Sequence, residues 1–209
     1  MARKASVSRE LAEVRRAALI DATIESLAAR GLGAVSVRDV AVRAGVSPGL
    51  LRHHFGSFGN LLLAAYRAVL GRVDARIDAA ITEAGADPAR RVRAFIKASF
   101  EPSIVDPDLL AAWLGFWGLV KSEPSAATVH AESFAAYRRR IEGLLAALAA
   151  FRGVPVDARL GALGLSALMD GLWLELCLDP SSFTPDEAVT LALNWVDGFI
   201  APSSTSRLA

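Results

Sequence analysis

Apolar residues recur every three or four positions along nearly the whole chain, which is the period of an amphipathic α-helix. Long stretches with this period run over residues 8–30, 57 or 60 to 84, 88–100, 106–122, 124–151, 156–178 and 184–200. No stretch alternates convincingly between apolar and polar residues with the period of two that a half-buried strand requires. The pattern therefore predicts an all-α protein.

Two shorter helices, separated by a tight turn, are predicted between Ser36 and Phe55. Ser36 is a suitable N-cap for the first, because its hydroxyl can accept a hydrogen bond from an early backbone N–H. Gly45 suits the left-handed position just after that helix, where a side chain would be strained. Ser47 followed by Pro48 predicts the start of the second helix, since proline at the first helical position gives up no backbone bond. The segment is therefore predicted to be a helix-turn-helix.

The second of these helices has two different faces. Leu51 and Phe55 are four residues apart and point the same way, so we expect them to pack against the protein. The opposite face holds Arg52, whose guanidinium can bond guanine O6 and N7 in the major groove of DNA. The candidate DNA contacts are Ser36, Arg38, Ser47, Pro48, Gly49, Leu50, Arg52, His53 and His54. For Arg38 and His54, a solvated or internally bonded side chain is the alternative.

The strings Ala44-Gly45-Val46-Ser47 and His54-Phe55 resemble the DNA-binding signature of TetR-type transcription regulators. The resemblance implies an N-terminal DNA-binding domain of three helices (1–55), a helical ligand-binding and dimerisation domain (56–201) and a flexible tail (202–209), with about nine helices in all. Two positions depart from the family pattern. Arg52 replaces a frequent tyrosine and implies altered base preference. Phe58 replaces a frequent phosphate-binding lysine and implies one fewer phosphate contact per subunit.

Two segments of the C-terminal part could bind a ligand. One is AWLGFW, which places Trp113 and Trp117 on one helical face with Phe116 beside them. The other is ALMDGLW, which places Asp170 and Trp173 in an otherwise apolar helix. Aromatic faces and a carboxylate together attract a quaternary ammonium group. In the alternative interpretation the aromatic rings are core residues, and Asp170 pairs with an arginine of the same or a second subunit.

The same two segments are similar to the C-terminal domain of BetI-type regulators, which belong to the TetR family, control choline-to-glycine-betaine genes and respond to choline. This resemblance implies a repressor that a small-molecule inducer, choline or a related cation, releases from a palindromic operator. It also implies that the effector pocket includes Trp113, Phe116, Trp117, Asp170 and Trp173. A family member that senses a hydrophobic or aromatic ligand and controls an efflux or metabolic operon is the alternative. No cofactor is expected.

The last two predicted helices carry more apolar surface than one chain can cover, which predicts pairing with a second subunit as a four-helix bundle. The residues concerned are Leu160, Leu163, Ala167, Met169 and Leu172 in one helix and Ala188, Leu191, Leu193, Trp195 and Phe199 in the other.

Composition and charge narrow the class of protein. Although 53% of the residues are hydrophobic, the longest uncharged apolar run, 109–120, is shorter than the about 20 residues of a membrane span. The net charge of +1 divides into nine basic and five acidic residues over 1–54, and an acidic excess beyond. A basic head suits DNA phosphates, and residues 1–7 are interpreted as a loose basic arm that could touch them.

The candidate chemistry argues against an enzyme. One cysteine and three histidines cannot build a disulfide or a metal cluster, and no nucleophile–base arrangement or phosphate loop can be assembled. Since residues 1–16 lack the apolar core of a signal peptide, a cytoplasmic protein is expected. A helical interaction or membrane-surface protein that binds no DNA is the distant alternative.

Overall fold

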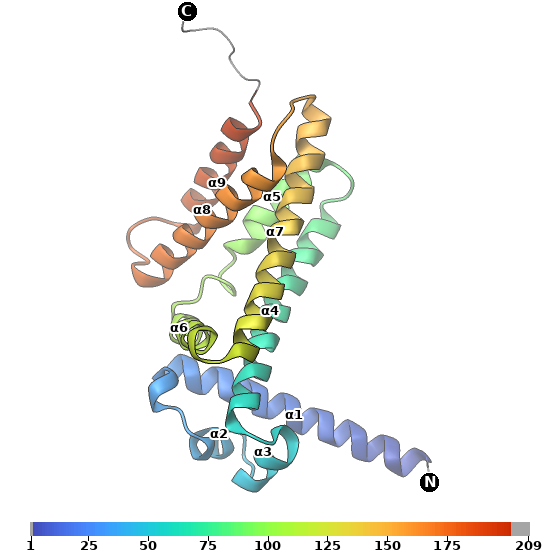
Figure 1. Ribbon diagram of the computed structural model, residues 1–209, viewed down its shortest axis with the longest axis vertical. Helices are drawn as coiled ribbons and strands as arrows, with labels where there is room; N and C mark the ends of the chain where they lie inside the picture. Colours follow the sequence, from blue (N-terminus) through green and yellow to red (C-terminus); the bar gives the residue numbers. More distant parts are fainter. Residues whose placement is uncertain (1, 202–209) are drawn as a thin grey trace, which may run out of the picture. The chain divides into compact units, whose positions relative to one another are not determined.

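The computed structural model describes the backbone of residues 2–201 and the side chains of residues 12–106 and 109–201. Over these residues the chain is all-α, as predicted, and contains no strand (Figure 1). Its elements are α1 (Ala2–Arg30), the short 3-10 helix η1 (Leu32–Ala34), α2 (Val37–Arg43), α3 (Pro48–Phe55), α4 (Phe58–Glu83), α5 (Pro88–Ser99), α6 (Pro107–Ser122), α7 (Pro124–Arg152), α8 (Ala158–Leu178) and α9 (Pro185–Phe199). The tail predicted at 202–209 lies outside the described residues.

Local capping explains why most helices begin where the sequence predicts. A capping box at the start of α2 joins Ser36 and Asp39, each side chain accepting from the backbone N–H of the other residue. Thr184 and Glu187 form the same box at α9. At α5, the Asp87 carboxylate accepts from two backbone N–H groups of the first turn. These side chains satisfy donors that every helix leaves unpaired at its N-terminus.

The N-terminal boundary of α1 differs from the prediction. The helix begins at Ala2 instead of Ser8, so the backbone of residues 2–7, predicted as a loose arm, is helical. The physical reason is local: the segment holds no glycine or proline, and alanine, arginine and lysine favour helix. The turn η1 was also not predicted. It follows Gly31, whose φ of +68° ends α1.

The described chain packs as two compact units. Residues 2–72 and 107–130 form the first, and residues 73–106 and 131–201 form the second, so α4 and α7 each contribute to both. The domain boundary predicted after residue 55 concerns DNA binding and ligand binding, and it stays a prediction.

The first unit contains the helix-turn-helix. α2 packs against both α1 and α3, and α1 also packs against α6 (Figure 1). Its core includes Leu27 from α1, Leu51 from α3, Tyr66 from α4 and Phe116 from α6, each at most 2% exposed. The core therefore holds the helix-turn-helix in a fixed arrangement within this unit.

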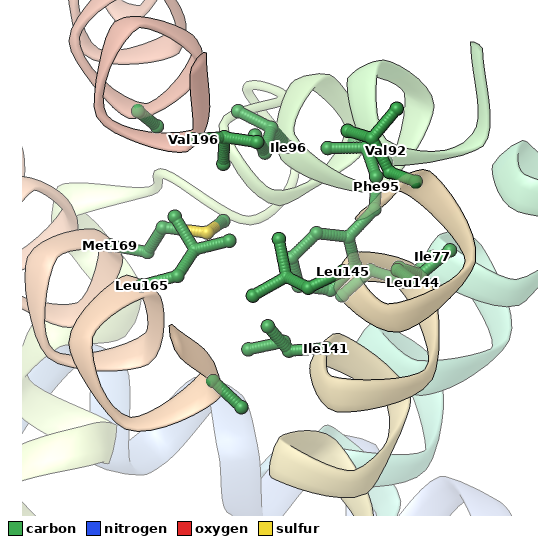
Figure 2. Packing of buried hydrophobic residues seen from close by; sticks show 14 of the residues in the cluster. Ile77, Val92, Phe95, Ile96, Ile141, Leu144, Leu145, Leu165, Met169 and Val196 are labelled. Atoms are coloured by element: carbon green, nitrogen blue, oxygen red, sulfur yellow. The ribbon is translucent and has the colours of Figure 1, made fainter. Parts of the chain in front are cut away.

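The second unit has its own core, formed where α4, α5, α7, α8 and α9 meet. Figure 2 shows Phe95 and Ile96 of α5 facing Leu145 of α7, with Met169 of α8 and Val196 of α9 nearby. α8 and α9 lie side by side. The core thus fixes the face of α8 that carries Met169 and leaves its other faces to solvent or to partners.

Among the described helices, α8 is long and apolar enough to span a membrane by length and composition alone, with a mean hydropathy of 1.4. Only 39% of that apolar window is buried within the chain. Core helices of globular proteins pass the same test, so composition alone does not separate the two possibilities.

Candidate DNA-binding surface and effector-binding residues

The turn between α2 and α3 has the geometry that the sequence predicts. Gly45 adopts φ +67°, in the left-handed region. Its N–H bonds the carbonyl of Val42 at 3.1 Å, and the N–H of Val46 bonds the carbonyl of Ala41 at 2.9 Å. This pair of bonds is a Schellman motif, which closes the carbonyl end of α2 and redirects the chain into α3.

The two faces of α3 are confirmed. Leu51 is 2% exposed and Phe55 is 7% exposed, so both fasten the helix to the core of the first unit. Arg52 and His53 are exposed. The arrangement presents a guanidinium and an imidazole to solvent on a helix of eight residues, which is what reading the major groove requires.

The first turn of α3 has little side-chain bulk and is exposed to solvent. Pro48 and Gly49 are exposed, Leu50 is half-buried, and the hydroxyl of Ser47 makes no capping bond. A Cβ added at Gly49 would meet only the Ser47 Oγ, at 3.9 Å, so the packing of the protein does not itself require glycine there. Another molecule can therefore approach this backbone closely.

The remaining predicted DNA contacts differ in their exposure and in the hydrogen bonds that they already make within the protein. Arg38 is exposed, on the first turn of α2. The hydroxyl of Ser36 both accepts from the backbone N–H of Asp39 and donates to its carboxylate, and this second bond lowers the pKa of Asp39. A phosphate would have to compete with the capping box. His54 is half-buried, with its ring 5.4 Å from that of His53.

An open hollow of about 620 Å³ borders α3. It is lined by Val37, Pro48, Gly49, Leu51, Arg52, Gly56, Ser57 and Phe58. Phe58, where the family pattern has a frequent lysine, contributes an apolar ring to this hollow and no charge.

The predicted effector residues divide between the two units, and each group is described by itself. In the first unit, Phe116 is fully buried and its ring stacks on that of Tyr66, with centroids 4.9 Å apart. Trp113 and Trp117 are half-buried, and the centroids of their rings lie 6.4 Å apart. The hydroxyl of Tyr66 pairs with His130 Nδ1 at 2.8 Å, and burial raises the pKa of Tyr66 to about 12. Phe116 is thus a core residue, as in the alternative interpretation of the aromatic segment.

In the second unit, Asp170 and Trp173 lie on α8. The indole Nε1–H of Trp173 donates to the carbonyl of Ile104 at 2.9 Å, which fixes the orientation of the ring. Asp170 is exposed to solvent, and no ion pair of the described residues includes it. Partial desolvation by surrounding atoms raises the pKa of Asp170 to about 6, against a smaller opposing effect of the Arg138 charge. Arg138 is therefore the cation of this chain whose charge favours the ionised form of Asp170.

Tyr137 of α7 belongs to the same neighbourhood and was not predicted. Burial, and next the negative charge of Asp170, raise the pKa of Tyr137, so its hydroxyl stays protonated at physiological pH. Its ring lies 5.8 Å from Phe95 and 6.3 Å from Phe134. The only signal in the sequence was the spacing of Phe134 and Tyr137, three residues apart on one helical face.

An ion cluster that acts on Tyr137 is centred on Arg140. Arg140 of α7 donates to Asp74 at 2.8 Å, and its Nε lies 3.0 Å from Asp78; both carboxylates are on α4. The charges of Arg140 and Asp74 both act on Tyr137. The second unit thus holds a protonated phenol that is influenced both by the Asp170 carboxylate and by the Arg140–Asp74 pair.

Comparison with known proteins agrees with this architecture. The family described as bacterial regulatory proteins, tetR family, matches residues 19–65, and the family described as BetI-type transcriptional repressor, C-terminal, matches residues 88–201. The HTH-type transcriptional regulator BetI of Burkholderia thailandensis is 37% identical over 194 residues, covering 91% of this chain and 95% of its own. The BetI of Paraburkholderia phymatum is 35% identical over 193 residues, covering 92% and 96%.

Solved structures extend the agreement to the fold. A crystal structure described as a transcriptional regulator from Pseudomonas aeruginosa PAO1 superposes with a TM-score of 0.83 at 44% identity, over 90% of this chain and 91% of its own. A regulator from Saccharomonospora viridis, crystallised in complex with choline, superposes with a TM-score of 0.77 at 22% identity, over 87% and 95%. The chain belongs to the TetR family of DNA-binding transcriptional regulators, with a C-terminal domain of the BetI type.

Proposed function

We propose that this regulator is a repressor that binds a palindromic operator as a homodimer and leaves it when a small quaternary ammonium compound, choline or a close relative, binds the second unit. The observation that carries the DNA-binding half is the pair of faces on α3: Leu51 and Phe55 are buried while Arg52 and His53 are exposed. The C-terminal family is described as a transcriptional repressor, which supports repression over activation.

In this proposal α3 enters the major groove and Arg52 reads a guanine edge by two parallel hydrogen bonds. Ser47, His53, His54 and Arg38 contact sugar–phosphate oxygens, and the thin start of α3 lets the backbone approach the groove. Ser36 contributes through the N-terminus of α2, because its hydroxyl already serves the capping box.

The homodimer forms through α8 and α9. Leu160, Leu163 and Leu191 of these helices are between 40% and 55% exposed in the single chain. Apolar side chains in such number at one surface are costly in water and typical of an interface. Pairing of these faces also explains why α8 is largely apolar although only 39% of its apolar window is buried within one chain. A cytoplasmic location follows from the operator as partner.

Asp170, Trp173 and Tyr137 support the cationic effector. The carboxylate supplies a charge, and the aromatic rings supply faces that attract a cation. Trp113 and Trp117 belong to the first unit, so they stay proposed residues of an effector pocket there, apart from the group of Asp170, Trp173 and Tyr137. The S. viridis regulator, which has a similar fold, was crystallised in complex with choline, and this supports the proposed effector.

A hydrophobic or aromatic effector is the second candidate. It is favoured by the half-buried rings of Trp113 and Trp117 in the first unit, whose centroids lie 6.4 Å apart beside the aromatic core formed by Phe116 and Tyr66. A ligand bound only to these two indole rings would need no positive charge.

One experiment separates these candidates. DNA fragments that the wild-type protein selects from a random-sequence pool serve as operator, and release is titrated with choline and with its neutral isostere 3,3-dimethylbutanol. We expect choline alone to release the DNA, and Asp170→Asn to weaken the response at least about tenfold. Arg138→Ala, which removes the competing internal cation, should leave the response intact or strengthen it. Equal release by both compounds would contradict the cationic effector.

A further inference from the structure

The carbonyl end of α3 is held from outside the helix-turn-helix. The last four carbonyl groups of a helix have no partner within it. In α3, the N–H of Gly56 bonds the carbonyl of Arg52 at 2.8 Å, and the side-chain amide of Asn60 donates to that of Phe55 at 2.9 Å. The carbonyl of His54 accepts from Arg16, a residue of α1, at 3.2 Å.

Arg16 makes a second contact with the same helix. The carbon at the centre of its guanidinium lies 4.4 Å from the centroid of the Phe55 ring. A flat cation above an aromatic face is attracted by the ring quadrupole, and a cation at the carbonyl end of a helix is favoured by the helix dipole. The Arg16 side chain therefore contacts both the carbonyl oxygen of His54 and the ring of Phe55, which packs α3 against the core.

The position of Arg16 distinguishes it from its neighbours. Arg16 is half-buried, whereas Arg15 beside it is exposed. Arg43, the basic residue at the end of α2, pairs instead with Glu25 of α1 at 3.3 Å. A planar guanidinium can stack and donate at once, which the single ammonium of a lysine cannot do with the same geometry.

We propose that Arg16 is a positioning residue for DNA reading: by tying the end of α3 to α1, it sets the angle at which the exposed face of α3 meets the base edges. This inference rests on the proposed reading of DNA by α3. Base recognition depends on bidentate geometry and is lost with a small rotation of the helix, whereas phosphate attraction tolerates it. Arg16 therefore contributes to specificity more than to affinity for DNA in general.

The test measures affinity for the selected operator and for unrelated DNA over a range of salt concentrations, with the full-length dimer. For Arg16→Ala we expect the ratio of the two affinities to fall about tenfold, with the affinity for unrelated DNA and the salt slope unchanged. Amide hydrogen exchange should accelerate in α3 and stay as in wild type in α5. Arg15→Ala is the matched control and should keep the wild-type ratio.

Two results would overturn the proposal. One is an unchanged ratio in Arg16→Ala. The other is a parallel loss of both affinities with a salt slope reduced by about one, which would make Arg16 a phosphate contact. If Arg16→Ala does not fold, Arg16→Lys decides: we expect a several-fold lower ratio at unchanged salt slope, and a wild-type ratio would refute the role of the guanidinium.

Arg52→Ala separates this proposal from the one on which it rests. Suppose that Arg52→Ala no longer prefers the operator to unrelated DNA, while Arg16→Ala keeps the wild-type ratio of the two affinities. This result overturns only the role of Arg16. An unchanged ratio in Arg52→Ala overturns the reading of DNA by α3, and the role of Arg16 with it.

Discussion

At the scale of single residues, Asp170 shows how partial desolvation by neighbouring atoms changes the pKa of a carboxyl group. A carboxylate on a helix surface ordinarily titrates near 4, but partial desolvation raises the pKa of Asp170 to about 6. The ionised form is therefore the costly one in the folded chain. Any stability that this group contributes is present below its unfolded pKa near 3.8 and is lost as the pH rises through about 6. A bound cation would stabilise the ionised form and reverse this preference.

The first prediction follows from that sign. Because only ionised Asp170 attracts a cation, the affinity for choline should rise roughly tenfold between pH 5 and pH 7, with a midpoint near 6. Binding below pH 6 should be accompanied by proton release, which calorimetry in buffers of different ionisation enthalpy measures. Asp170→Asn should remove the pH dependence. A wild-type affinity that is flat over this range would contradict the involvement of Asp170.

Arg140 gives a second prediction at this scale. Its side chain is 20% exposed and joins Asp74 and Asp78 of α4 to α7. Removing it leaves two carboxylates side by side, although solvent screens them because they are 40% and 59% exposed. We expect Arg140→Ala to lower the free energy of unfolding by about 1 kcal/mol, measured by urea denaturation. Arg139→Ala, at an exposed neighbouring position, should change it far less; equal effects would show that the ion cluster is not stabilising.

At the scale of helices, most of the fold could be predicted because the signals are local. Ser36, Gly45, Pro48 and Asp87 act within their own turns, and each predicted boundary beside them is confirmed. The start of α1 differs from the prediction because helix propensity, and not charge, decides the backbone conformation of residues 2–7. The place of Tyr137 near Asp170 depends on which helices pack together, which no local pattern reports.

The contact between α8 and α9 carries the third prediction. A Cβ added at Gly161 would lie 2.4 Å from the Phe199 ring, which itself stacks on Trp195 with centroids 5.1 Å apart. The stacked rings cannot move aside freely, so Gly161→Ala should cost about 1–3 kcal/mol of unfolding free energy. Gly171→Ala lies on the same helix with no atom within 4 Å, and it should instead stabilise by about 0.5–1 kcal/mol. Thermal unfolding of both variants provides the measurement, and a neutral Gly161→Ala would refute the close packing.

At the scale of the whole molecule, the proposed dimer links DNA binding to dimerisation, because one α3 would cover only half of a palindromic site. In that dimer the exposed leucines of α8 and α9 would affect DNA binding without touching DNA. A charge at Leu163 or Leu191 would have to be desolvated when two copies meet. We expect Leu163→Glu to produce monomers in sedimentation and to lose operator affinity at least a hundredfold, since two-site binding is lost. Leu114→Glu on α6, at a leucine that is 51% exposed against 40% for Leu163, should remain dimeric.

The spacing of the operator halves tests the same linkage from the side of the DNA. Two copies of α3 held by one dimer can enter successive major grooves on one face of the duplex only when the half-sites are about one helical turn, or a multiple of it, apart. Inserting about 5 base pairs between the halves turns one of them to the opposite face, so affinity should fall to that of a single half-site. The Leu163→Glu monomer should bind both DNAs equally weakly, since it has no second α3 to misplace. Equal binding of the wild-type dimer to both spacings would mean that the two recognition helices are not held by a common interface, and that the dimer proposed through α8 and α9 is not the DNA-binding species.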